Sequence, residues 1–67
     1  MYYSPLSFYD DMRGSLIEQN KLKEVYLECC KKRGLDPYPI KSLTAKNTLK
    51  FKNVRLCLID GRMVYKI

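Results

Sequence analysis

The sequence contains no histidine, so it lacks the side chain that most often moves protons near neutral pH. It also has no glycine-rich phosphate loop and no Gly-x-Ser-x-Gly nucleophile turn. Asp10 and Asp11 are adjacent, and on a helix their side chains would diverge by about 100°. They therefore do not form a working carboxylate pair, and we expect that this chain is not an enzyme.

The cysteines are few and are not spaced as metal ligands. Cys29, Cys30 and Cys57 include no Cys-x-x-Cys pair, and without histidine a tetrahedral zinc site would need carboxylates to complete it. An odd number of cysteines without a secretory signal indicates reduced thiols. We expect no metal ion or other cofactor, and we assign Cys29 to the core because free cysteines are usually buried.

Long apolar runs are also absent. No segment approaches the roughly 18 apolar residues of a membrane-spanning helix, and the N-terminus lacks the basic and apolar regions of a signal peptide. We therefore expect a complete small cytoplasmic protein that does not enter the membrane. Its 67 residues, 46% of them hydrophobic, should form a single domain over positions 1–67.

The last third of the chain predicts a β-hairpin. Asp60-Gly61 favours a type I′ turn, in which both central residues have positive φ. This turn fixes the opposed pairs as Ile59/Arg62, Leu58/Met63, Cys57/Val64, Leu56/Tyr65, Arg55/Lys66 and Val54/Ile67. Opposed residues share a face, so every second pair, starting with Leu58/Met63, builds an apolar face. We expect that face, Leu56 included, to lie on the main core.

A change of alternation precedes the hairpin. Leu49 and Phe51 are apolar at odd positions, whereas the following strand is apolar at even positions, so the parity shifts at 52–53. A tight turn there would make residues 48–67 a three-stranded meander, and a bulge would instead leave one long bent strand. We favour the meander, because its pairing keeps the apolar residues on one face.

Residues 4–33 have helical patterns with a break at Gly14-Ser15. Ser4-Pro5 is typical of a helix start. The second helix should begin between 16 and 21, with Ser15–Glu18 as a capping box or Asn20 as a cap. Its apolar stripe is Leu22, Val25, Tyr26 and Cys29. Gly34 should end it in the left-handed conformation, with Leu35 folding back. Residues 35–40 should be extended because of their prolines, and 41–47 are compatible with one or two helical turns.

These elements predict an α+β fold, in which two N-terminal helices pack on a small C-terminal antiparallel sheet of two or three strands. A winged helix is the alternative, because a short third helix before a hairpin is the right order of elements. Polar residues of that segment are types that reach phosphates and bases: Lys41, Ser42, Thr44, Lys46 and Asn47. Against it, Pro37-Tyr-Pro39 is stiff and lacks glycine, which is unusual for a helix-turn-helix turn.

The positive charge is uneven. Residues 1–33 hold six basic and five acidic groups (net +1), whereas residues 34–67 hold seven and two (net +5). The meander would align Lys50, Arg55 and Lys66 on the face opposite the core, with Lys46, Lys52 and Arg62 at its margins. Like charges in opposed positions destabilise a sheet unless an anion lies over them. The plainer interpretation is a solvated face whose lysines protect sheet edges.

We therefore expect a small basic protein that binds DNA or RNA by contacting phosphates through one face of its sheet. The basic face carries no aromatic ring, so a stacking platform for single strands is not expected. The alternative is a protein-binding modulator or inhibitor, of a phage or mobile-element type, that acts on an acidic surface of a host protein. Tyr2, Tyr3 and Phe8 would then be the contact residues, unless they pack in the core.

Overall fold

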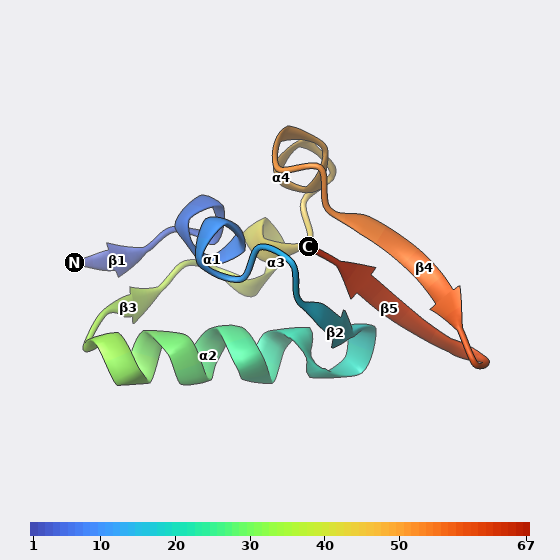
Figure 1. The fold of residues 1–67 in the computed structure, drawn as a ribbon. Helices are drawn as coiled ribbons and strands as arrows, with labels where there is room; N and C mark the ends of the chain where they lie inside the picture. Colours follow the sequence, from blue (N-terminus) through green and yellow to red (C-terminus); the bar gives the residue numbers. More distant parts are fainter.

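The computed structural model describes all of residues 1–67 and has a mixed α+β fold. Its elements in chain order are β1 (Tyr2–Tyr3), α1 (Pro5–Asp11), β2 (Leu16–Glu18), the 3₁₀ turn η1 (Gln19–Lys21), α2 (Leu22–Arg33), β3 (Asp36–Pro37), α3 (Ile40–Leu43), α4 (Lys46–Phe51), β4 (Arg55–Ile59) and β5 (Arg62–Lys66). Figure 1 shows α2 along one side of the molecule, with α1 and α4 on the other and the β4–β5 hairpin reaching outward.

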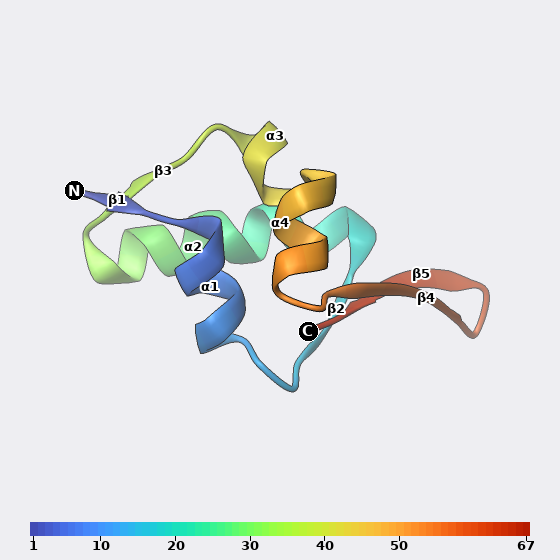
Figure 2. The ribbon, with the colours of Figure 1, turned by 90° about the horizontal axis from the view of Figure 1, so that it is seen from above.

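Two small sheets hold the ends of the chain. β2, β5 and β4 form an antiparallel sheet in that order, so the last strand is the central one. β1 and β3 form a short parallel pair beside the C-terminal end of α2. Seen from above, the hairpin extends well past the helices (Figure 2), so the outer part of the sheet is not covered by them.

The hairpin prediction is confirmed. Asp60 and Gly61 have φ values of 50° and 75°, as a type I′ turn requires. The five pairs from Arg55/Lys66 to Ile59/Arg62 form in the predicted register. The prediction that the whole apolar face lies on the core is wrong. Leu56, Leu58 and Met63 are 42%, 70% and 39% exposed, and only Val54, Tyr65 and Ile67 of that face are buried. The helices cover the base of the hairpin only, and Leu56 lies on its outer strand.

The third strand of the sheet is not the predicted one. Residues 46–51 form α4, so both the meander and the bent strand are wrong. Leu49 packs against the core and Phe51 is exposed, and the change of alternation reflects the end of a helix, followed by Asn53 at φ 55°. The third strand is β2, in the predicted capping box, because pairing with β5 places Ile17 opposite Tyr65 in the core.

The helix boundaries follow the predicted signals at most ends. The hydroxyl of Ser4 caps α1 by accepting from the N–H of Leu6 at 3.2 Å. α2 ends at Gly34 with φ 65°, and the N–H of Leu35 donates to the carbonyl of Cys30 at 3.0 Å, which is the Schellman arrangement. Neither Ser15 nor Asn20 caps α2, because η1 leads directly into its first turn.

The core is rich in aromatic residues. Its buried members are Tyr3, Phe8, Tyr9, Ile17, Leu22, Tyr26, Cys30, Leu43, Val54, Tyr65 and Ile67. Phe8 lies edge-on to Tyr26 with ring centroids 5.2 Å apart, and the hydroxyl of Tyr9 donates to the carbonyl of Leu43 at 2.6 Å. Cys30 is the buried cysteine of α2, whereas Cys29 is only partly buried against this core. The buried residues of α2 are Leu22, Tyr26 and Cys30. Each lies four residues, or about one helical turn, after the one before it, so all three lie on one face of the helix.

The winged-helix alternative is not confirmed. Between α2 and α4 the chain forms β3 and the short α3 instead of a tight turn. The prolines at 37 and 39 explain this course, because each disfavours the helical conformation in the residue before it. The residues around them therefore stay extended, and Asp36–Pro37 pair with Tyr2–Tyr3.

Candidate nucleic-acid interface

The structure places the six predicted basic residues in three different settings. Lys46 and Lys50 lie on α4, and Arg55 and Lys66 are opposed on β4 and β5. Lys52 and Arg62 are held in ion pairs with carboxylates. Only Arg55 and Lys66 of the predicted row are strand neighbours, because Lys50 belongs to a helix and not to a third strand.

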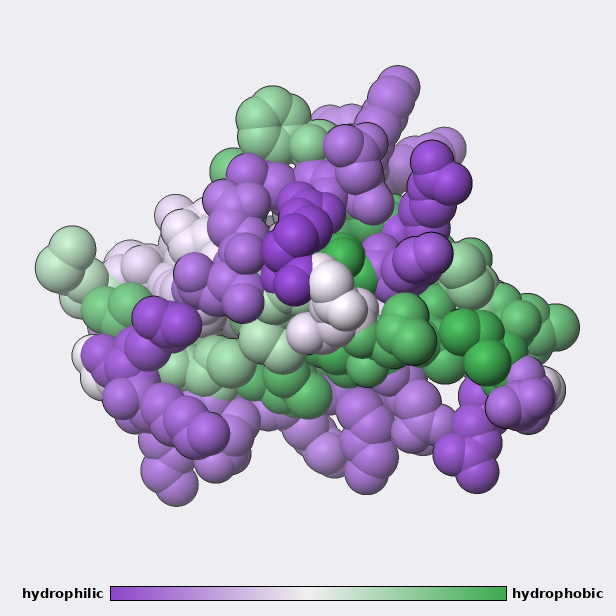
Figure 3. Space-filling view, viewed as in Figure 1, coloured by the Kyte–Doolittle hydropathy of each residue, from purple (hydrophilic) through white to green (hydrophobic).

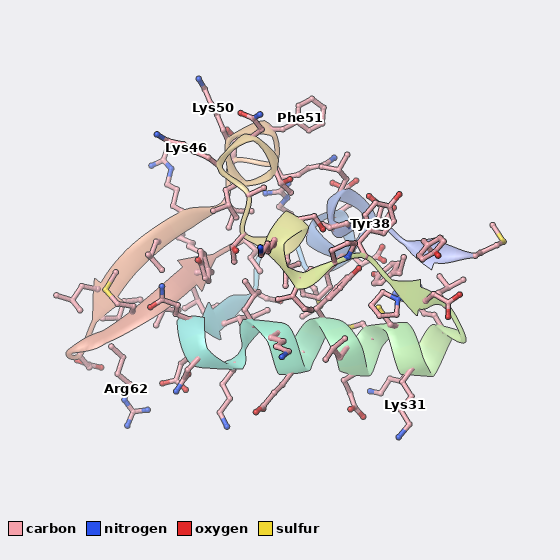
Figure 4. The ribbon with its side chains drawn as sticks, turned by 180° about the vertical axis from the view of Figure 1, so that it is seen from behind. Lys31, Tyr38, Lys46, Lys50, Phe51 and Arg62 are labelled. Carbon is pink, nitrogen blue, oxygen red and sulfur yellow. The ribbon has the colours of Figure 1, made fainter.

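α4 presents a mainly polar surface to solvent. It begins after Ala45, and Leu49 turns inward, while Lys46, Asn47 and Lys50 are exposed. The ring of Phe51 is also exposed beside Lys50, so the expectation that no aromatic ring lies near the basic residues is wrong. Figure 4 shows Lys46 and Lys50 pointing away from the body of the molecule on the same edge. A lysine at either end of this surface, with an amide between them, provides donors for phosphate oxygens and a group that can pair with a base edge.

Arg55 and Lys66 lie close to this helix. Their side chains share the sheet face opposite Tyr65, because opposed residues share a face and neighbours along a strand alternate. Arg55 is three residues beyond Lys52, the residue that ends α4, so its Cα lies at most about 11 Å from that point. The end of α4 and the strand pair are therefore neighbours, and we group Lys46, Lys50, Arg55 and Lys66 as the basic surface.

Lys52 serves the fold rather than an external anion. Its ammonium lies 2.9 Å from a carboxylate oxygen of Asp10, and its side chain is only 18% exposed. The backbone carbonyl of the same residue accepts from the guanidinium of Arg13 at 2.8 Å. These contacts fasten the end of α4 to the end of α1, and the charge of Lys52 is balanced within the chain.

Arg62 is also balanced within the chain. Its guanidinium donates to a carboxylate oxygen of Glu18 at 2.9 Å, which joins β5 to β2. In Figure 4 it projects from the edge of the molecule opposite Lys46 and Lys50. Arg62 therefore lies away from Lys46 and Lys50, although alternation along β5 puts it on the same sheet face as Lys66.

The segment that carries Lys46, Lys50 and Arg55 contains no acidic residue. None occurs between Asp36 and Asp60, a stretch that includes α3, α4 and β4. None of the ion pairs in the structure involves a residue of the basic surface. The acid-free stretch also contains Lys41 and exposed Asn47, which were predicted as contact residues only for the winged-helix alternative and not for the sheet face. No family model, curated protein or solved structure matches this chain.

Two of the three aromatic residues considered for a protein contact are inaccessible. Tyr3 and Phe8 are buried in the core, where their rings lie 6.3 Å apart. Tyr2 is 68% exposed and its ring lies edge-on to that of Tyr38 at 5.8 Å. The N-terminal aromatic cluster is therefore mainly a packing feature, and only Tyr2 could reach a partner.

Cysteine and carboxylate side chains are dispersed in the fold. No group of three or more histidine, cysteine, aspartate or glutamate side chains comes together as metal ligands. Burial raises the pKa of the Cys30 thiol above its ordinary value, which keeps it protonated. None of the helices has the length and apolar character needed to cross a membrane.

Proposed function

We propose that this protein binds nucleic acid through the phosphate backbone, using the basic surface of α4, β4 and β5. The observation that carries the proposal is the set of four cations on this surface, none of which has a carboxylate partner. A cation that already pairs with a carboxylate contributes little to phosphate binding, because the phosphate must first displace that carboxylate. Unpaired cations are available to replace the counterions of a phosphate backbone.

The arrangement suits a backbone rather than a small anion. The four side chains come from a helix and two neighbouring strands and point outward from an exposed surface, whereas small ligands are usually held in concave sites. Phosphates along a strand of duplex recur every few ångströms, so cations spread over neighbouring elements can contact several of them. Asn47, next to Lys46 on α4, would be able to read a base edge.

Salt dependence provides the first test. Binding to a labelled duplex and to single-stranded DNA and RNA would be measured by fluorescence anisotropy between 50 and 200 mM salt. Four phosphate contacts predict a slope of about −3.6 on a double-logarithmic plot for duplex DNA, or roughly a hundredfold loss of affinity over that range. Absence of binding to all three at the lowest salt would contradict the proposal.

A charge-matched pair of variants locates the site. The variant Lys46→Ala, Lys50→Ala, Arg55→Ala removes three cations from the basic surface. The control Lys23→Ala, Lys31→Ala, Lys32→Ala removes three exposed cations from α2, and Figure 4 shows Lys31 projecting on the opposite side of the molecule. We expect the first variant to lower the slope by about 2.7, and the control to leave most of it. Equal losses would mean that net charge, and not this surface, drives binding.

The protein-modulator alternative gives the opposite result in a pull-down. A nucleic-acid-binding protein should lose its partners from a lysate after nuclease treatment. One stoichiometric protein that survives nuclease, together with no binding in the anisotropy assay, would support a modulator instead.

A further inference from the structure

Strand β4 has an open hydrogen-bonding edge. It is the outermost strand of the order β2-β5-β4, so only one of its sides is paired. The residues that flank a two-residue turn, here Ile59 and Arg62, form a hydrogen-bonded pair, and such pairs alternate along the hairpin. Leu58 and Leu56 therefore direct their backbone N–H and C=O groups away from β5.

The neighbouring backbone agrees with this alternation. Val54 alternates with Leu56 and Leu58 along the chain, so its backbone groups also point away from β5. Its N–H donates to the carbonyl of Leu49 at 2.9 Å instead of to a strand. No bond of this kind reaches Leu56 or Leu58, and no side chain bonds to them. α4 thus covers the edge at Val54 and leaves the rest of β4 open.

This edge lacks the protection that exposed strands usually carry. Natural edge strands are commonly short, bulged, or interrupted by lysine or proline. β4 has five residues, continuous pairing and no charge after Arg55. The opposite edge, β2, has three residues and ends at Glu18, which is paired with Arg62. The two edges of one sheet therefore differ, and only β4 is suited to accept another strand.

The side chains around this edge are apolar and exposed. Leu58 is 70% exposed, and Leu56, Ile59 and Met63 are each exposed by about two fifths of their surface. Figure 3 shows hydrophobic atoms from the middle of the molecule along the hairpin towards its tip, while α2 below is hydrophilic. Exposure of this much aliphatic surface to water is unfavourable, so binding of a partner that covers it would be favourable.

We propose that β4 pairs antiparallel with β4 of a second copy, which joins the two three-stranded sheets into one sheet of six strands. A two-fold axis at Cys57 is the register in which all five residues of β4 find partners. Cys57 then faces Cys57 of the second copy, and Leu56 faces Leu58. Both leucines present outward-directed backbone groups, so each such pair forms two hydrogen bonds.

Charge favours a second copy as the occupant. In this register Arg55 faces Ile59 of the other copy, and the two arginines lie at opposite ends of the ladder. Four residue steps separate them by about 14 Å, which exceeds the Debye length of about 8 Å at physiological salt. The remaining paired side chains are uncharged. The apolar strand is therefore complementary to itself, and this inference does not depend on the proposed binding of nucleic acid.

Oxidative cross-linking tests the register. Opposed residues in a non-hydrogen-bonded pair have Cα atoms about 4.5 Å apart, which lies within the range of disulfides. Mild oxidation of the wild-type protein should therefore yield a covalent dimer on a non-reducing gel. Cys57→Ser should abolish that dimer, whereas Cys29→Ser should retain it. A dimer that persists in Cys57→Ser would overturn the register at Cys57.

Sedimentation under reducing conditions tests the interface itself. Wild-type protein should sediment as a dimer at about 100 μM, a concentration that populates even weak dimers. Leu58→Lys should weaken the dimer by about tenfold or more, because a charge replaces a covered leucine. Phe51→Lys is the matched control, since Phe51 is 71% exposed and lies on α4. A monomeric wild type, or equal effects of the two lysines, would overturn the proposal, as would a different protein bound at β4 while the chain stays monomeric.

Discussion

The hydroxyl of Tyr26 donates a hydrogen bond of 2.5 Å to the backbone carbonyl of Tyr3, and the two rings stack with centroids 6.0 Å apart. The same hydroxyl oxygen accepts from the N–H of Tyr38 at 2.8 Å. One buried phenol on α2 thus binds a backbone carbonyl of β1 and the backbone N–H of the residue that follows β3. Short two-residue strands have little stability of their own, so this side chain is central to the N-terminal end of the fold.

Removing that hydroxyl should be costly. We expect Tyr26→Phe to lower the free energy of unfolding by about 1–3 kcal/mol, because it leaves a carbonyl and an N–H without their partner. Tyr38→Phe is the control, since the ring of Tyr38 lies at the surface and should change stability by less than about 0.5 kcal/mol. Urea unfolding followed by circular dichroism would measure both. A Tyr26→Phe protein as stable as Tyr38→Phe would contradict the role assigned to the hydroxyl.

Buried phenols should make the protein sensitive to alkali. Burial raises the pKa of Tyr3, Tyr9 and Tyr26 above the ordinary value of about 10. The unfolded chain then loses these protons first, so the contribution of the phenols to stability is constant below pH about 10. It falls as the pH rises further, by up to about 1.4 kcal/mol per pH unit for each phenol. Tyr9→Phe should make this decline shallower in urea titrations at successive pH values. If the stability of Tyr9→Phe fell with pH as steeply as that of the wild type, the contribution assigned to Tyr9 would be wrong.

The turn residues should differ in their tolerance of substitution. Gly61 has φ 75°, a region that β-branched side chains avoid, so Gly61→Val should lower the melting temperature strongly. Asp60→Asn should be nearly neutral, because asparagine is favoured at that position of a type I′ turn. Thermal melts of both variants would show the difference, and similar melting temperatures would mean that the turn is not needed for stability.

Two leucines that differ in burial should differ in how much their substitution by alanine destabilises the protein. Leu43 is 1% exposed, and Leu43→Ala should lower the free energy of unfolding by about 2–5 kcal/mol. Leu27 lies on the outer side of α2, and Leu27→Ala should lower it by no more than about 1 kcal/mol. Denaturant unfolding of the two variants would test whether α3 belongs to the core. Equal losses would indicate that it does not.

The parts of the fold that the sequence predicted correctly are those controlled by local interactions. The turn at Asp60-Gly61 and the end of α2 at Gly34 depend on backbone conformations that few residues adopt easily. β2 was missed because its residues also fit a helix-capping pattern, and only their pairing with β5 decides between the two. α4 was missed because alternation over two apolar positions, Leu49 and Phe51, does not distinguish a strand from the end of a helix.

The candidate site was predictable to a similar extent. The pairing of Arg55 with Lys66 followed from the hairpin register and is present. The role of Lys50 as a strand residue depended on the meander, which does not form. Lys52 and Arg62 find carboxylates 42 and 44 positions away in the chain, and no local pattern indicates contacts between residues so distant. Which cations are free was therefore visible only in the folded chain.

The central position of β5 has a consequence for the order of folding. β2 and β4 contact each other only through β5, and Glu18 and its partner Val64 are 46 positions apart in the chain. A hairpin of this size forms in about 1–10 μs, whereas docking of β2 must first close a long loop at an entropic cost. We therefore expect the β4–β5 hairpin to exist early as an independent unit, and the joining of β2 to limit the folding rate.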